Sequence, residues 1–108
     1  MASEGGIAKA STKCGDLLYS GVGVLRPHKT ESVVYYRKGA EQGDAQALNN
    51  LALVFESGFD GNPPDYFEAA RYYEKAIGRE NSDAMLNYAI LVQNVSSAYN
   101  GSMMYVLI

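Results

Sequence analysis

The strongest constraint in this sequence is a self-similarity at an interval of 37 residues. Shifted by this interval without gaps, Tyr35-Tyr36 falls on Tyr72-Tyr73. The other matches along the same shift include Ser20-Gly21 with Ser57-Gly58, Pro27 with Pro64, Glu31 with Glu68, Ala47 with Ala84 and Asn50 with Asn87. A repeat of this length, carried by paired helices, is the signature of an α-solenoid. Because one pair cannot bury its apolar face alone, neighbouring pairs must stack and share a core.

Residues 35–52 join two such helices through a very short turn. Gly43 can adopt a positive φ and end the first helix, and Asp44 can then cap the second by accepting free backbone N–H groups. After it come apolar residues at helical spacing, which give the second helix a buried stripe. These residues are Ala47, Leu48, Leu51, Ala52 and Phe55. A joint this short makes the two helices antiparallel.

The same reasoning predicts five helices and an all-α fold. The expected spans are 8–19, 29–42, 45–57, 65–78 and 82–94, with Asp65 and Glu68 as a capping box on the fourth. The predicted fold is a right-handed α-solenoid of antiparallel helix pairs, with two full repeats and a partial third. We expect residues 1–8 to form a flexible tail, residues 9–94 the repeat domain, and residues 95–108 a cap or an irregular tail.

Each predicted helix has an apolar set that we expect to be buried. The first helix should bury Cys14, Leu17 and Leu18, and the second Val33, Val34, Tyr36 and Ala40. The fourth should bury Ala69, Tyr72, Tyr73 and Ala76, and the fifth Met85, Tyr88, Ala89 and Val92.

The motif that carries the repeat resembles the Sel-one-like repeat family, a relative of the tetratricopeptide repeat. The clearest match is the run from Tyr35 to Gly43, YYRKGAEQG, followed by the run from Ala69 to Ala76, AARYYEKA. Two departures stand out. Gly39 replaces the family's alanine, which should weaken its helix by about 1 kcal/mol. The second repeat ends in Gly78-Arg79-Glu80-Asn81, so its closing glycine is lost or displaced.

Composition narrows the classes of function. The net charge of −3 argues against a nucleic-acid partner, which selects a basic patch. No apolar run is long enough for a membrane span, and no secretory signal follows Met1, so the cytosol is the expected compartment. Cys14 and His28 are the only residues of their kinds, and they fall on different elements. We therefore expect no enzyme activity, no metal site and no cofactor.

The resemblance implies a non-catalytic scaffold that binds a protein or peptide on a concave face lined by the first helix of each pair. In the register of the tetratricopeptide relatives, the groove positions are Lys9, Thr12, Asp16 and Tyr19, then Gln46, Asn49, Leu53 and Glu56, then Asp83, Leu86, Ile90 and Gln93. Asn50 and Asn87 recur near the packed stripe, where we expect them to bond the backbone of a neighbouring helix.

A second interpretation stays open from the sequence. The chain could assemble end to end with another solenoid through its terminal helices, including self-association through its C-terminal end. Residues 95–108 bear on this choice, because they share nothing with the earlier second helices. They either fold back over the fifth helix as a cap or form a ragged end. An uncovered fifth helix would leave its apolar stripe in water, which favours the cap.

Overall fold

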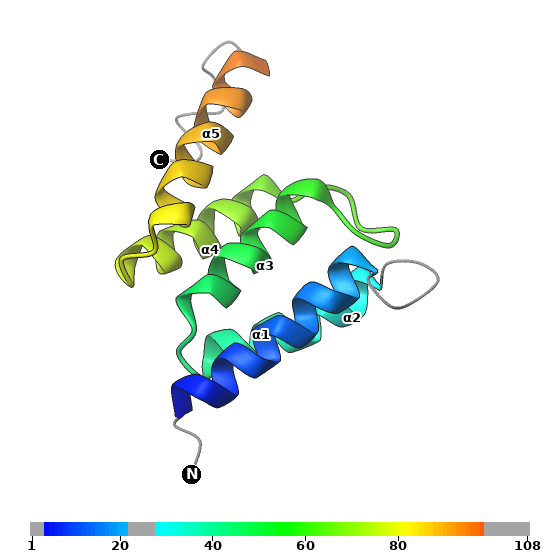
Figure 1. Ribbon diagram of the computed structural model, residues 1–108. Coiled ribbons are helices and arrows are strands. Elements are labelled where there is room, and N and C mark those ends of the chain that lie inside the picture. Colours follow the sequence, from blue (N-terminus) through cyan, green and yellow to red (C-terminus); the bar gives the residue numbers. More distant parts are fainter. Residues whose placement is uncertain (1–3, 22–27, 99–108) are drawn as a thin grey trace.

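The protein folds into a series of antiparallel helices, seen here in a computed structural model that describes residues 4–21 and 28–98. The helices are α1 (Glu4–Ser20), α2 (Lys29–Glu41), α3 (Ala45–Ser57), α4 (Tyr66–Gly78) and α5 (Ser82–Ala98) (Figure 1). Within these ranges the only bridged β-pair is the isolated contact between Phe59 and Asn62. The all-α prediction is confirmed.

The first and last helices are longer than the sequence suggested. α1 begins at Glu4 rather than Ala8, so part of the segment expected to be a tail is helical. α5 continues to Ala98, past the expected end at Asn94. Residues 99–108, most of the segment for which a cap or a ragged end was considered, lie outside the described residues.

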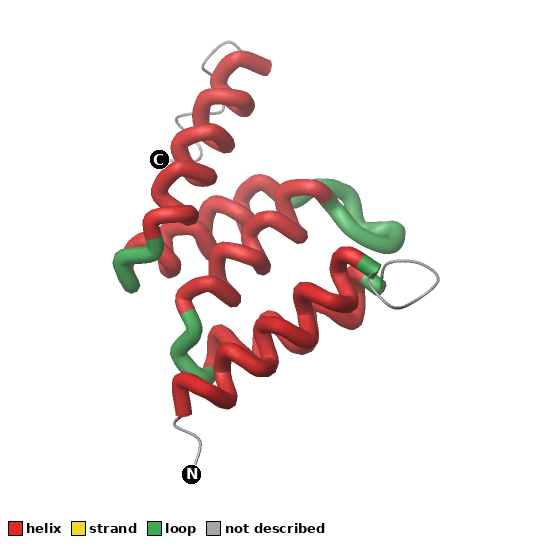
Figure 2. The backbone as a smooth tube through the Cα atoms, viewed as in Figure 1, coloured by secondary structure: helices red, strands yellow, loops and turns green. Residues whose placement is uncertain are grey.

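The helices stack pairwise into a thin two-layer array. α1 packs on α2 and α3 packs on α4, while α2 contacts α3 and α4 contacts α5. In Figure 1, α2 lies behind α1 and α4 behind α3, and Figure 2 shows the loops confined to the ends of the pairs. The smallest extent of the Cα positions is 16 Å, about the thickness of two packed helices. We call the surface of α1, α3 and α5 the first-helix face.

The turn between α2 and α3 forms as predicted. Gly43 has a φ of +101°, and the Asp44 side chain accepts the backbone N–H of Gln46 at the start of α3. One repeat later the same turn is built from different residues. Glu80 occupies the place of Gly43 with a φ of +63°, and Asn81 accepts the backbone N–H of Ala84. The closing glycine is therefore replaced rather than displaced.

The core is continuous through the pairs. Tyr73, Leu51, Leu91 and Val54 are among the largest fully buried side chains. Of the predicted core of α2, Val33 and Tyr36 are buried, but Val34 is 52 % exposed, so its prediction is wrong. Val34 follows Val33 directly, and adjacent residues on a helix lie about 100° apart, so both cannot face the same neighbour.

Two glycines let α1 and α2 approach closely. A Cβ on Gly15 would lie 2.6 Å from the Tyr36 ring. A Cβ on Gly39 would clash with Thr12 Oγ1 and lie 3.1 Å from the backbone oxygen of Ala8. The prediction that Gly39 merely weakens its helix is thus incomplete, because the packing of the pair requires it.

The buried stripe of α1 was predicted wrongly. Cys14 is exposed, and so is Leu17, at 53 %. The buried positions are instead small, namely Ala8, Thr12 and Gly15. One repeat later, the counterparts Leu51 and Val54 are buried on α3, a helix that contacts the preceding pair. No described helix precedes α1, so this side of it is uncovered.

The fifth helix, at the other end of the array, also exposes residues that were predicted to be buried. Met85 is 48 % exposed and Ala89 is also exposed, although both were predicted to be inward. Ala84, Leu91 and Val95 are buried in their place. The counterparts Leu48 and Ala52 are buried on α3, a helix that α4 follows and contacts. No described helix follows α5, so the same positions lie open.

The loop before α4 reaches back to the first repeat. Asp60 Oδ2 accepts the backbone N–H of Thr30 at 2.9 Å, and it thereby caps α2, whose own N-cap residue makes no side-chain bond. Asp65 caps α4 as predicted by accepting the N–H of Glu68. The reciprocal half of the capping box is absent, because the Glu68 carboxylate pairs with Arg71 and the Asp65 N–H bonds to Phe55.

Candidate functional site

The predicted groove residues lie on the first-helix face with very different exposure. Asp83, Gln93 and three apolar side chains are exposed, the apolar ones being Leu53, Leu86 and Ile90 at 38 %, 64 % and 44 %. The half-buried members are Asp16, Tyr19, Gln46 and Glu56. Lys9, at the start of the series, is exposed.

Two predicted groove positions are buried and unavailable to a partner. Asn49 is 2 % exposed and Thr12 is 4 % exposed. Thr12 Oγ1 lies 2.6 Å from Asp44 Oδ2 and 3.0 Å from the carbonyl oxygen of Ala8, so it supports the turn between the repeats. The 3.6-residue period turns these positions into the crevice between neighbouring helices rather than onto the outer surface.

A hydrogen-bonded network of side chains joins α1 to α3. Asp16 Oδ1 accepts the Tyr36 hydroxyl at 2.7 Å and the Asn50 amide at 2.9 Å. On α3 itself, Asn50 Oδ1 accepts the Gln46 amide at 3.0 Å. The acceptor of Asn50 on the neighbouring helix is therefore a carboxylate side chain, which corrects the expected backbone bond.

The network continues from α3 to α5. The Asn87 amide donates to Asn49 Oδ1 at 3.0 Å, and the Asn81 amide donates to Gln46 Oε1 at 3.2 Å. Asn87 thus also bonds a side chain instead of the expected backbone. We call the connected set Asp16, Gln46, Asn49, Asn50, Asn81 and Asn87 the polar ladder. Because these amides bond one another, the ladder fixes the spacing of the three first helices.

Two buried tyrosines anchor carboxylates of the first-helix face. Tyr36 donates to Asp16, and Tyr73, its counterpart one repeat later, donates to Glu56 Oε1 at 2.7 Å. Burial, followed by the bond to the carboxylate, raises the pKa of both hydroxyls well above the usual value. Both tyrosines therefore stay neutral donors and hold the carboxylates in place.

Three exposed apolar residues of the predicted groove lie on α3 and α5. The bond between Asn49 and Asn87 brings these helices together at one level. Leu53 follows Asn49 by one turn, and Leu86 and Ile90 flank Asn87 by one and three residues, so all three lie beside that bond. We call Leu53, Leu86 and Ile90 the apolar patch.

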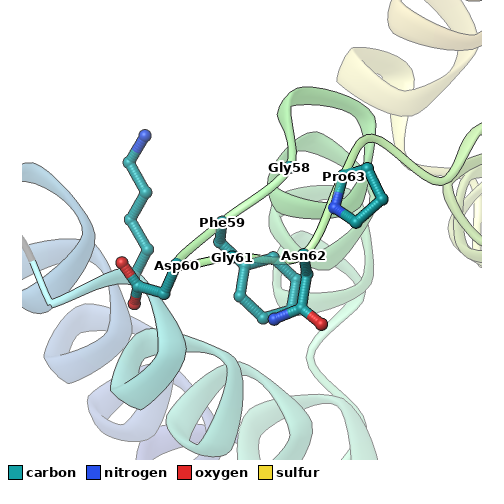
Figure 3. Close-up of a pocket in the computed structure, with 7 residues that line it drawn as sticks. Gly58, Phe59, Asp60, Gly61, Asn62 and Pro63 are labelled. Atoms are coloured by element: carbon teal, nitrogen blue, oxygen red, sulfur yellow. The ribbon is translucent and has the colours of Figure 1, made fainter.

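Two hollows lie away from this face. One, of about 640 Å³, is formed by Lys29 and the loop from Gly58 to Pro63 (Figure 3). One of its polar side chains, Asp60, already caps α2, so this hollow is a junction between repeats. The second, of about 560 Å³, lies between α2, α3 and α4. The sequence reasoning did not identify it, because its charged residues come from separate helices.

The described residues contain no convergent set of three or more metal-ligating side chains of the His, Cys, Asp or Glu types. None of the described helices combines the length and the apolar character that a membrane crossing requires.

Comparison with known proteins places the repeats in a family. The family model described as Sel1 repeat matches residues 8–44 and 45–79, which are the α1–α2 and α3–α4 pairs with their turns. The chain belongs to the Sel1 repeat family. Its two matched Sel1 repeats coincide with the interval of 37 residues found in the sequence.

A solved Sel1 structure has the same architecture. The crystal structure of a Sel1 repeat protein from Oxalobacter formigenes is 32 % identical in sequence, with a TM-score of 0.69. The match covers 79 % of this chain but 34 % of the other, so this chain spans about a third of that relative. No curated protein matches the chain. Sel1 repeats are generally protein–protein interaction modules.

Proposed function

We propose that the chain is a non-catalytic scaffold that binds an extended peptide segment of a partner protein on the first-helix face. The observation that supports this most directly is the apolar patch, whose three side chains are exposed beside a network of mutually bonded amides. Exposed apolar side chains on a rigid support are what a binding surface requires, because little ordering remains to be done on association.

The chemistry of the face suits a peptide in an extended conformation. Side chains of the peptide would contact Leu53, Leu86 and Ile90, while its backbone would meet the polar groups at the rim. Gln93 and Asp83 are exposed on the same helix as most of the patch and offer a donor and acceptors. Gln46 and Glu56 are already engaged in hydrogen bonds within the protein. We therefore expect them to shape the surface rather than to bond the peptide directly.

The test begins with peptides selected by display against the full chain. A selected peptide is then measured against Leu86→Asp and Ile90→Asp, which place a charge in the patch. We expect each to weaken binding by about tenfold or more, as for central interface residues. The matched control is Phe67→Asp, an equally exposed apolar position on α4. Binding that is unchanged in the patch variants, or lost equally in the control, would overturn the proposal.

A second candidate function is end-to-end assembly with another solenoid. Its support is the pair of uncovered apolar sides, Cys14 and Leu17 on α1 and Met85 and Ala89 on α5, at positions whose counterparts are buried inside the array. Light scattering across a dilution series tests it. Association that is abolished by Leu17→Asp or Met85→Asp and unaffected by Phe67→Asp would favour assembly; a monomer at every concentration would exclude self-assembly.

We infer the cytosol as the compartment. The single cysteine, Cys14, is a free and exposed thiol, which suits a reducing environment.

A further inference from the structure

The groove between α2, α3 and α4 is basic, although the chain as a whole is acidic. We call it the basic groove; its lining residues are Arg37, Ala40, Glu41, Leu48, Leu51, Tyr72, Lys75, Gly78 and Arg79. Three of these are cations and one is an anion, in a chain whose net charge is −3. Clustering of charge against the overall balance creates a local field that favours anions.

The three cations have no carboxylate partner within the described parts of the chain. The ion pairs found there are His28 with Glu31 and Glu68 with Arg71, so none involves Arg37, Lys75 or Arg79. Glu41 lines the same groove, but it is not within ion-pairing distance of them. Three unpaired cations around one hollow repel one another, and an anion bound among them would relieve that repulsion.

Two of the three cations, Arg37 and Lys75, are held in position by Tyr72. Arg37 Nη1 donates to the Tyr72 hydroxyl at 2.8 Å, and its guanidinium lies 5.8 Å from the Phe55 ring centroid. Lys75 Nζ lies 5.6 Å from the centroid of the Tyr72 ring, which is buried. The Arg37–Tyr72 bond uses one of the five guanidinium N–H groups and leaves the others for a ligand.

The positive charges of the groove also affect the neighbouring carboxyl group of Glu68. The pKa of Glu68 is lowered, first by its hydrogen bond with Arg71 and further by the charges of Arg37 and Lys75. The floor of the groove is apolar, because Ala40, Leu48 and Leu51 line it. A ligand that fits must combine an anionic group with an apolar neighbour.

We propose that the basic groove binds a short acidic peptide segment of a partner protein, separately from the first-helix face. A glutamate or aspartate carboxylate would pair with Arg37, Lys75 and Arg79, since guanidinium and carboxylate form strong paired bonds. The apolar side chain next to it would contact Leu48 and Ala40. The volume of about 560 Å³ accommodates a few residues, within the usual range of ligand sites.

The basic character is specific to this groove, because the equivalent positions of the next repeat do not have it. At the counterpart of Arg37 stands Glu74, whose carboxylate accepts the Tyr88 hydroxyl at 2.8 Å. At the counterpart of Leu48 stands the exposed Met85. The repeat fold alone therefore does not produce an anion site.

The experiment uses the full 108-residue chain and two synthetic peptides, acetyl-Glu-Leu-Glu-Leu-Glu-amide and its analogue with glutamine for glutamate. Binding is followed by amide NMR shifts in low salt and again in high salt. We expect the glutamate peptide to shift amides around Arg37, Leu48 and Lys75, and to bind about tenfold or more tighter than the glutamine peptide. The affinity should fall with salt.

Variants at exposed positions separate the groove from general charge. Lys75→Glu and Arg79→Glu should weaken the glutamate peptide by about tenfold or more. Lys13→Glu, the same change at an exposed site on α1 that does not line the groove, should alter it by less than about twofold. Glu41→Gln should tighten it by roughly two- to threefold, since a like charge leaves the rim. This gain of affinity cannot result from misfolding.

Several results would overturn the proposal. They are shifts confined to other residues, no binding at all, equal binding of the glutamine peptide, or equal losses in Lys13→Glu. Displacement by inorganic phosphate at equal concentration would identify a site for small oxyanions rather than for a peptide. The outcome is independent of the apolar patch, because Leu86→Asp leaves the basic groove intact and should not change the affinity of the glutamate peptide.

Discussion

The two complete repeats have the same helices at the same interval, yet they make their closest contact with different residues. In the first repeat Gly39 lies against Thr12 and Ala8, and a Cβ there would clash. In the second repeat its counterpart Ala76 is fully buried with its methyl group in place. The helix spacing within a pair is therefore set locally, and the family's preferred alanine would not fit in the first repeat.

The repeats also differ at the turn that ends each second helix. Gly43 and Glu80 both have positive φ angles, +101° and +63°. Glycine accepts such a backbone without cost, whereas a residue with a Cβ pays about 1–2 kcal/mol. The second repeat is therefore strained where the first is relaxed, although both turns lead into a capped helix.

The second helices of the two repeats begin differently as well. α4 is capped by Asp65, the residue directly before it. α2 receives its cap from Asp60, in the loop of the following repeat. The first arrangement is local, whereas the second links the ends of two repeats and so adds to the stacking between them.

The prediction with the largest expected effect concerns the close contact between α1 and α2 at Gly39. Gly39→Ala should lower the free energy of unfolding by about 1–2 kcal/mol, because overpacking costs more than the roughly 1 kcal/mol that alanine gains in a helix. Urea unfolding followed by circular dichroism measures this. The control is Gly78→Ala, where nothing lies within 4 Å of the new Cβ, and it should be neutral or stabilising. A stabilised Gly39→Ala would show that the helices can separate freely.

The second prediction exchanges the turn residues. Gly43→Glu should destabilise by about 1–2 kcal/mol, and Glu80→Gly should stabilise by up to about 1 kcal/mol, because the left-handed strain moves with the Cβ. Thermal and urea unfolding of the two single variants and of the double variant measure both effects. If Glu80→Gly were destabilising, the Glu80 side chain would stabilise the fold by more than its left-handed backbone conformation costs.

Much of this fold could be predicted from the sequence, because the repeat interval, Gly43 and Asp44 are all local signals. The errors lie where burial depends on what stands next to a helix. Met85 and Ala89 have the spacing of core residues, and they would be core residues if a described helix followed α5. Cys14 and Leu17 stand in the same relation to a preceding helix. Periodicity identifies a side of a helix, but only the neighbouring element determines whether that side is covered.

The candidate surfaces were predictable to a smaller extent. Leu53, Leu86 and Ile90, which the register assigned to the groove, are exposed, because no described element packs over that side of α3 and α5. It failed for Asn49, which turns into the crevice and bonds Asn87. The basic groove has no local signal at all, since Arg37, Lys75 and Arg79 come together only when α2 and α4 pack on α3.

The third prediction concerns the cap shared between repeats. The pKa of Asp60 is lowered, chiefly by its bonds with Thr30. A lowered pKa in the folded state means that the stabilisation is present above the unfolded value of 3.8 and is lost as the pH falls through the folded value. Asp60→Asn should therefore lower the melting temperature at neutral pH and flatten its decline in acid.

Thermal unfolding at several pH values checks this change in the shared cap. Thr30→Val serves as a partial control, because it removes the hydroxyl donor and keeps the backbone N–H bond. At neutral pH, Thr30→Val should lower the melting temperature by part of the amount that Asp60→Asn does. Identical acid profiles for the wild type and Asp60→Asn would mean that the link between repeats contributes nothing.

The prediction with the smallest expected effect compares Tyr36 and Tyr73, inside the array, with Tyr88 on α5. Burial, then the bond to Glu74, raises the pKa of Tyr88 from 10.0 to about 12. A raised pKa means that the stabilisation is complete below pH 10 and is lost as the pH rises through about 12. At neutral pH, Tyr88→Phe should cost less than about 0.5 kcal/mol, because the bond is exposed to water.

An alkaline titration followed by ultraviolet difference absorbance and by helix content separates the two environments. Tyr88 should ionise without loss of α1 to α4, because it lies on the last helix and its partner Glu74 is exposed. Tyr36 and Tyr73 should ionise only together with unfolding, since both are buried against carboxylates. In Tyr88→Phe the absorbance change that precedes unfolding should be smaller by the contribution of one of the chain's nine tyrosines, while the cooperative step remains. A single step common to all three would mean that α5 is as firmly held as the complete pairs, and that the open end of the solenoid is no weaker than its middle.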